Sequence, residues 1–169
     1  MHLYSTIDMK TIEIAAKISI FDEIELSEEQ KNVIEAAKRA TTGSYAPYSH
    51  FKVGAACLLD NGEIISGSNQ ENAAYPSGIC AERTTLFYAM AKYPESKVLK
   101  LAVVACDDEG VFTDDIAAPC GACRQVIYET ECRSKGPIEI LLPTAKEGVY
   151  VFESIKILLP FGFGPENLI

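Results

Sequence analysis

Three cysteines and a glutamate occur at spacings that suit a metal ion with an acid–base group beside it. Cys120 and Cys123 form a C-x-x-C pair directly after Pro119, and Cys80 and Glu82 flank a single alanine in an earlier fragment. Residues three apart on a helix share a face, so Cys120 and Cys123 can bind the same ion. Zinc is the natural occupant of such a thiolate pair. The two fragments together therefore predict a zinc site formed by the three cysteines.

The place of Glu82 beside Cys80 restricts where the metal can lie. Residues two apart on a regular helix point to nearly opposite sides, so both can serve one site only in front of the helix end. Pro76-Ser77-Gly78 provides a helix start at that place. Three cysteine ligands leave the fourth position of zinc open for water, which is the arrangement of a catalytic site. We therefore expect Glu82 to be an acid–base group near that water, without binding the metal.

Other interpretations of these fragments stay open. A C-x-x-C pair alone can be redox-active or coincidental, and Glu82 alone can be an exposed residue at a helix start. A structural zinc is a further alternative, with Cys57, Cys106 or Cys132 as its fourth ligand. Because Cys57 and Cys106 lie in apolar runs, we interpret both as small buried hydrophobic residues. Cys132 lies among charged residues and is expected to be a surface thiol.

The composition is typical of an ordinary globular protein and leaves small molecules open as partners. The chain has 169 residues, of which 48% are hydrophobic and 23% are charged. At about 100–200 residues per domain, this length favours one domain. Its 15 basic and 24 acidic residues give a net charge of −9, which disfavours nucleic acids and anionic membranes as partners. No uncharged stretch is long and apolar enough to span a bilayer.

The N-terminal residues and the cysteines indicate in which cellular compartment the protein is located. Residues 1–10 lack the apolar segment and small-residue cleavage site of a secretory signal. A domain of this size does not need disulfides for stability, so the six cysteines are expected to stay reduced. We therefore expect a cytoplasmic protein.

The pattern of apolar residues predicts the elements that must position the cysteines. Ser27 and Gln30 form a capping box, which predicts an amphipathic helix over residues 28–41. The other expected elements are strands over 51–59 and 63–67, a helix over 79–93, a strand over 99–106, a helix over 120–131, strands over 138–142 and 149–152, and a short helix over 154–159. This alternation predicts a three-layer α/β/α sandwich with a central mixed five-stranded sheet, whose late part is parallel.

The domain organisation follows from these elements. We expect a single domain over residues 27–169, because no repeat or linker divides this part of the chain. Residues 1–26 are interpreted as an N-terminal extension of unknown role. Within it, residues 11–21 alternate between isoleucines and smaller or polar residues, and fit either a strand or a helix.

The cysteine fragments and the segments around them carry a family resemblance. The pattern of Cys80-Ala81-Glu82 with Pro119-Cys120-Gly121-Ala122-Cys123 resembles the signature of zinc-dependent deaminases. The chain is most similar to the small cytidine deaminases, homotetramers with a three-cysteine zinc site. The matching segments are residues 48–56, 67–76, 79–84, 119–125, 158–160 and 163–165. The resemblance covers the chain from about residue 30 to residue 167 and is specific, because its motifs occur in order.

The resemblance implies an activity and a cofactor. A protein of this family deaminates cytidine and deoxycytidine hydrolytically to uridine and deoxyuridine in pyrimidine salvage. It holds one Zn²⁺ per subunit, here on Cys80, Cys120 and Cys123, with Glu82 as the catalytic proton shuttle. Arg83 resembles the family residue that donates hydrogen bonds to the thiolates, although it could also be a solvated helix cation.

The resemblance also implies which residues contact the nucleoside. Asn69 and Glu71 correspond to the pair that binds the ribose, with ordinary turn residues as the alternative. Phe51 would pack against the pyrimidine ring, while Ala81 and Tyr75 would lie beside the pocket. Phe163 would reach the site of a neighbouring subunit. For Phe51, Tyr75 and Phe163 the alternative is plain core packing.

Three other functions compete with a cytidine deaminase. An antibiotic nucleoside deaminase of the blasticidin S type would share the same zinc motifs. A structural-zinc interaction module would need a fourth protein ligand. An RNA-editing deaminase is disfavoured by the net charge of −9 and the absence of tryptophan, which suit neither phosphate binding nor base stacking.

Overall fold

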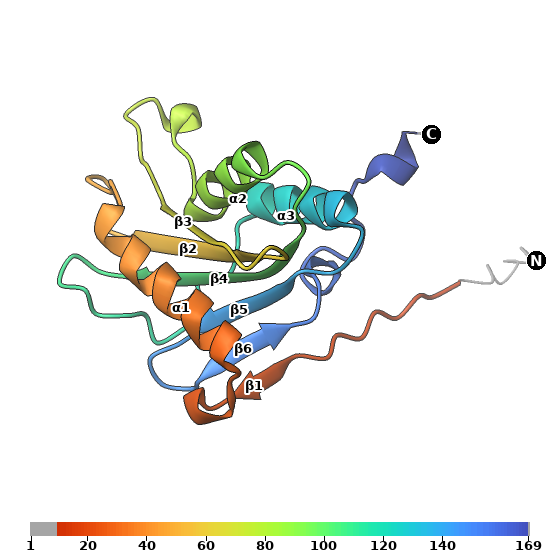
Figure 1. The fold of residues 1–169 in the computed structure, drawn as a ribbon, viewed down its shortest axis with the longest axis horizontal. Helices are drawn as coiled ribbons and strands as arrows, with labels where there is room; N and C mark the ends of the chain where they lie inside the picture. The colour runs from red at the N-terminus through yellow and green to blue at the C-terminus, as the bar shows by residue number, and fades with distance from the viewer. Residues whose placement is uncertain (1–9, 169) are drawn as a thin grey trace, which may run out of the picture.

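The apolar runs of the sequence form one central sheet of six strands, seen in a computed structural model that describes residues 10–168 (Figure 1). The strand order is β1-β6-β5-β4-β2-β3. The strands are β1 (Ser19–Phe21), β2 (Lys52–Leu59), β3 (Ile64–Ser68), β4 (Val98–Cys106), β5 (Glu139–Pro143) and β6 (Val149–Phe152). The predicted fold class is confirmed, but the predicted number of five strands is wrong. The sixth strand is β1, a three-residue edge strand that pairs with β6 in the segment leading to the domain.

Strand directions differ from the prediction in one place. Only the pair β4 and β5 is parallel, and β6 returns antiparallel to β5. The loop between β5 and β6 is short, and a short loop can join only antiparallel neighbours. Gly148 makes this turn possible with a φ of +90°, a conformation that favours glycine. The late part of the sheet is therefore mixed rather than parallel.

Helices cover both faces of the sheet and divide the core in two. Helix α1 (Glu28–Ala40) packs on one face, mainly over β2 and β4, with Val33, Ile34 and Ala37 buried in the core on that side. Helices α2 (Ala81–Lys92) and α3 (Gly121–Ser134) lie side by side on the other face (Figure 1). Alternate residues of β2 and β4 point into the two cores, as the pleat of a strand requires. Both strands are consequently buried on both faces.

Local signals place the ends of the elements. At the start of α1, the Gln30 amide donates to Ser27 Oγ (3.3 Å) and the Ser27 amide to Gln30 Oε1 (2.9 Å), which confirms the capping box. The predicted helix over 154–159 is only a 3₁₀ turn at Ile155–Ile157. No helix within residues 10–168 has both the length and the apolar character needed to span a membrane.

The cysteines outside the predicted site have different surroundings. Cys57 and Cys106 are buried in strands of the sheet, as predicted. Cys132 is half-buried and packs against the core below α3, so the expectation of a surface thiol is wrong. Helix α3 turns this position toward the sheet although charged residues flank it in sequence.

Candidate active site

The three predicted ligands meet where two helices begin. Cys80 is the N-cap residue of α2, Cys120 is the N-cap residue of α3, and Cys123 lies in the first turn of α3. Their Sγ atoms all lie within 4.8 Å of one another. An N-cap side chain stands in front of the helix, which is the arrangement expected for Cys80 and Glu82. The positive ends of both helix dipoles point at the thiols and favour their ionised form.

The sulfur spacing fits a tetrahedral zinc ion. Zinc–thiolate bonds of about 2.3 Å at tetrahedral angles place two sulfurs about 3.8 Å apart. The Sγ atoms of Cys80 and Cys120 are 3.8 Å apart. Among the residues that the structure describes, the cluster of potential ligands contains these three cysteines and no fourth member. Cys57, Cys106 and Cys132 therefore do not complete a structural site, and three thiolates suit a zinc ion with an open position.

The thiols of Cys80 and Cys123 titrate as a pair. Hydrogen bonding with Cys123, then with Arg83 and Cys120, lowers the pKa of Cys80 to about 5 against the desolvation that opposes it. The same interaction with Cys80, followed by burial and the charge of Glu82, raises the pKa of Cys123. These interactions favour the thiolate on Cys80 over the thiolate on Cys123, and a bound metal would hold all three cysteines as thiolates.

Glu82 lies directly behind the cluster in the first turn of α2. The residue is only 4% exposed. Burial raises the pKa of its carboxyl group above the usual range, and the charge of Cys80 adds to this effect. A carboxyl group with a raised pKa can take up and return a proton near neutral pH. Glu82 therefore has the burial and the position of an acid–base group.

Arg83 turns its guanidinium group toward the cysteines. Its Nη2 atom donates to Cys80 Sγ at 3.7 Å. Hydrogen bonding to Cys80 raises the pKa of Arg83. The buried Nε atom of Arg83 has no hydrogen-bond partner among the residues that the structure describes. The guanidinium is therefore directed at the sulfur atoms, which argues against the alternative of a solvated helix cation.

The predicted sugar-binding residues lie in the segment that follows β3. Asn69 Oδ1 accepts from the Val53 amide (2.8 Å), and Asn69 Nδ2 donates to the Phe51 carbonyl (2.9 Å). Glu71 Oε2 accepts from the amides of Tyr48 (2.9 Å) and Ser49 (3.3 Å). Hydrogen bonding with Ser49 and Tyr48 lowers the pKa of Glu71, so this side chain is an anion at neutral pH. Both residues are half-buried.

Comparison with known proteins decides the family. The family described as the cytidine and deoxycytidylate deaminase zinc-binding region matches residues 27–135. The chain belongs to this family. The cytidine deaminase of Sporosarcina psychrophila is 39% identical over 138 residues, which cover 82% of this chain and 93% of that protein. The cytidine deaminase of Halalkalibacterium halodurans is 46% identical over 103 residues, covering 60% and 71%.

A solved deaminase structure supports the same assignment. The crystal structure of cytidine deaminase from Burkholderia pseudomallei matches with a TM-score of 0.68 and 41% identity, covering 82% of this chain and all of that chain. The family match is a zinc-binding region that includes Cys80, Cys120 and Cys123, and the cluster of these three cysteines is suited to holding the Zn²⁺ cofactor. The family match and the cysteine cluster confirm the predicted Zn²⁺ cofactor.

The aromatic residues predicted for the deaminase pocket are exposed in the single chain. Phe51 is 44% exposed, Tyr75 is 91% exposed and Phe163 is 58% exposed, so plain core packing does not account for them. Ala81 has no exposed surface in the single chain and is buried in the core at the start of α2. Their contacts with a nucleoside stay predictions.

Two side-chain contacts of the site region were not predicted. Ser44 Oγ donates to Asn69 Oδ1, and Gln70 Nε2 donates to the Gly43 carbonyl (2.9 Å). Both join the segment before β2 to the segment after β3. These partners lie far apart in sequence, and neither residue type nor local spacing marks them, so no sequence signal could have found them.

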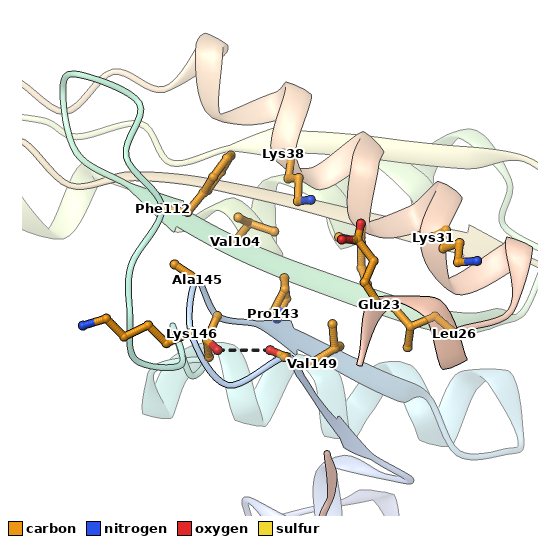
Figure 2. Close-up of a pocket in the computed structure, with 13 residues that line it drawn as sticks. Glu23, Leu26, Lys31, Lys38, Val104, Phe112, Pro143, Ala145, Lys146 and Val149 are labelled. Atoms are coloured by element: carbon orange, nitrogen blue, oxygen red, sulfur yellow. Dashed lines mark hydrogen bonds between the residues drawn. The ribbon is translucent and has the colours of Figure 1, made fainter. Parts of the chain in front are cut away.

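A separate cavity lies on the opposite face of the sheet. It has a volume of about 290 Å³ and opens between α1, the end of β4 and the loop after β5 (Figure 2). Lys31, Lys38 and Lys146 line it, but each pairs with a carboxylate, as in the contact of Lys38 with Glu35 at 2.8 Å. Its apolar walls belong to the core under α1. The cavity is therefore distinct from the cysteine site.

Proposed function

We propose that this chain deaminates cytidine and deoxycytidine hydrolytically, releasing ammonia and forming uridine and deoxyuridine. The observation that carries the proposal is the meeting of the Cys80, Cys120 and Cys123 sulfurs beside the buried carboxyl group of Glu82. The relatives named above carry the name cytidine deaminase, which supports the same activity. Three protein ligands and an adjacent acid–base group are the parts of a hydrolytic zinc site.

The proposed roles follow from the protonation behaviour of each group. Zinc, when bound, supplies a water whose pKa is lowered to about 7. Glu82 takes a proton from the attacking water and delivers it to ring N3 of cytosine. Water oxygen adds at C4, Glu82 takes the second proton from the new C4 hydroxyl and passes it to the amino group, and the C4–N bond breaks to release ammonia and leave the C4 carbonyl. The raised pKa of Glu82 suits both steps, because the carboxyl group must gain and lose a proton in each cycle.

The positive charge of Arg83 has a separate role. Three thiolates with Zn²⁺ leave one net negative charge, which makes the metal a weaker acid. The guanidinium group of Arg83 donates to Cys80 Sγ at 3.7 Å, and its positive charge partly neutralises the negative charge on the sulfur. Arg83 thus acts on the metal through a ligand and does not contact substrate.

The nucleoside is proposed to bind between the segments around β2 and β3. Asn69 and Glu71 offer an amide and a carboxylate for the sugar, and Phe51 offers a ring for the pyrimidine. The exposure of Tyr75 suits a residue beside the pocket, and the exposure of Phe163 fits a contact with a neighbouring subunit. We therefore include a homotetramer in the proposal, with Phe163 reaching a neighbouring site. Sedimentation analysis of the purified protein tests the assembly.

The cellular role is proposed from the chemistry and from the cysteines. All six cysteines are free thiols, which suits a reducing compartment such as the cytoplasm. Deamination of free nucleosides belongs to pyrimidine salvage. The net charge of −9 disfavours a nucleic acid substrate.

An ultraviolet assay tests the proposed activity. Purified protein of known zinc content is incubated with cytidine, deoxycytidine or blasticidin S, and loss of the cytosine absorbance is followed. We expect turnover of cytidine and deoxycytidine with a higher kcat/KM than for blasticidin S. Turnover of blasticidin S alone would instead assign the chain to the antibiotic deaminases.

A further inference from the structure

Asn69 has every lone pair of its side-chain oxygen in use. Its Oδ1 atom accepts from the Val53 amide at 2.8 Å and from Ser44 Oγ at 2.5 Å. Its Nδ2 atom donates one hydrogen to the Phe51 carbonyl at 2.9 Å. An amide oxygen has two lone pairs and an amide nitrogen has two hydrogens. Among the contacts within residues 10–168, Asn69 therefore keeps one N–H for a ligand and no acceptor.

Ser44 differs in kind from the other two partners of Asn69. The Val53 amide and the Phe51 carbonyl are backbone groups, which any residues at these positions would provide. Together they fix which way the Asn69 amide faces. The Ser44 hydroxyl is the contribution of a side chain, and it occupies the lone pair that the backbone leaves open. Loss of this hydroxyl would let Asn69 Oδ1 accept from water or from a ligand.

The close approach of α1 to β2 determines where Ser44 lies. A Cβ atom at Gly54 would lie 2.1 Å from the Ala37 carbonyl oxygen and 2.8 Å from the Thr41 nitrogen, so only glycine allows this contact. The 3₁₀ turn Thr41–Gly43 continues from the end of α1, and the Ser44 amide donates to the Thr41 carbonyl at 3.1 Å. Ser44 is thus held in a fixed place beside the start of β2.

We propose that Ser44 is a positioning residue of the nucleoside site, which makes Asn69 a pure hydrogen-bond donor toward the sugar. The inference rests on the proposed function, because it takes Asn69 as a sugar-binding residue. A sugar hydroxyl that accepts from Asn69 must donate its own hydrogen to another group. Glu71 is an acceptor-only carboxylate two residues along the same segment. A donor at Asn69 and an acceptor at Glu71 together select a hydroxyl group, which does both.

Binding of the reaction product tests this role independently of catalysis. The Kd values of uridine, 2′-deoxyuridine and 3′-deoxyuridine are measured by calorimetry on the zinc-loaded full chain. Ser44→Ala is expected to weaken uridine binding about three- to tenfold, the effect of one hydrogen bond. One of the two deoxyuridines lacks the hydroxyl that Asn69 contacts. For that ligand, Ser44→Ala should raise the Kd by less than about twofold. Ser44→Thr keeps a hydroxyl and is expected to restore uridine binding.

Gln70→Ala is the matched control. Gln70 Nε2 donates to the Gly43 carbonyl (2.9 Å) and to Ser68 Oγ (3.2 Å), so it joins the same two segments without touching Asn69. A general loosening of the segment after β3 would lower the affinity for all three ligands alike. The Kd values of Gln70→Ala show how large that effect is. If Ser44→Ala does not fold, Ser44→Gly removes the same hydroxyl. The proposal is overturned if uridine binds the Ser44 variant as well as the wild type, or if all three ligands weaken equally.

Failure of the inference and failure of the proposed function give different results. Wild-type turnover of cytidine with no effect of Ser44 on uridine binding removes only the role of Ser44. Uridine binding that depends on Ser44 in a protein that does not deaminate cytidine removes the activity and keeps the positioning role. A protein that binds no uridine contradicts both.

Discussion

The Sγ atoms of Cys80 and Cys120 lie 3.8 Å apart, although they cap the first turns of two different helices. Strand β4 separates α2 from α3 in sequence, and the sheet brings the N-terminal ends of both helices to the same place. The cysteine cluster is consequently a product of the whole fold. A helix N-terminus also stabilises a thiolate, so position and electrostatics favour metal binding together.

Removal of any one cysteine of the cluster should release the metal. Cys80→Ala, Cys120→Ala and Cys123→Ala each leave two thiolates, too few to hold a site with an open position. We expect zinc well below one per chain and loss of activity in all three variants. Metal analysis by atomic emission on the purified proteins measures this directly.

Cys132→Ala is the control for these variants. Cys132 is a half-buried thiol outside the cluster, and its replacement should leave zinc bound. A full complement of zinc in any of the three cluster variants would mean that another residue is a ligand.

The site should select nucleosides over nucleotides that carry a 5′-phosphate on the sugar. Residues 67–76 contain no lysine or arginine. Arg124, a basic residue of α3, donates instead to the carbonyls of Pro119 (2.8 Å) and Leu158 (3.0 Å). Lys52 is paired with Asp108 at 3.1 Å. A phosphate of about −2 charge would therefore meet Glu71 without a cation of its own.

Side-by-side kinetics on cytidine and cytidine 5′-monophosphate measure this selectivity. We expect kcat/KM for the monophosphate to be lower by about 10²-fold, which corresponds to about 2.7 kcal/mol of lost transition-state binding. Both substrates are assayed at one pH and one salt concentration, because screening changes the repulsion. Comparable efficiencies would contradict a role in nucleoside salvage.

Glu131 should matter for stability rather than for turnover. Its buried carboxylate accepts from the Ile138 amide (3.0 Å), the Ile155 amide (2.9 Å) and Ser154 Oγ (2.9 Å), which joins the end of α3 to the segments beside β5 and β6. Glu131→Gln replaces the charge-assisted hydrogen bonds from the two backbone amides with neutral ones, and its amide nitrogen can only donate to Ser154 Oγ, which must then accept. We expect the free energy of unfolding to fall by about 1–3 kcal/mol.

Chemical denaturation measures that change, and Glu129→Gln serves as its control because Glu129 is exposed on the same helix. The control should shift stability by less than about 0.5 kcal/mol. Equal denaturation midpoints for wild type and Glu131→Gln would show that these three hydrogen bonds do not stabilise the fold.

Much of the site could be predicted because its signals are local. The C-x-x-C spacing, the pairing of Cys80 with Glu82 and the capping box of Ser27 are each contained in a few consecutive residues. The contact of Ser44 with Asn69 could not be predicted, since it depends on how α1 approaches β2 at Gly54. For a similar reason the sequence left residues 11–21 open between strand and helix, and only Ser19–Phe21 proves to be a strand. Three residues become a strand only because β6 presents a free edge.

Glu82→Gln most directly tests whether Glu82 carries the proton in the proposed deamination. The variant keeps the size of the side chain and removes its ability to carry a proton, so zinc content and fold should not change. Zinc, ammonia release and uridine formation are measured on the same samples of wild type and variant. We predict one zinc per chain in both proteins, and turnover of cytidine reduced about 10²-fold or more in the variant, the effect of a missing acid–base group. Near-normal turnover by a zinc-loaded Glu82→Gln protein would contradict the assignment of Glu82 and of the catalytic site around it.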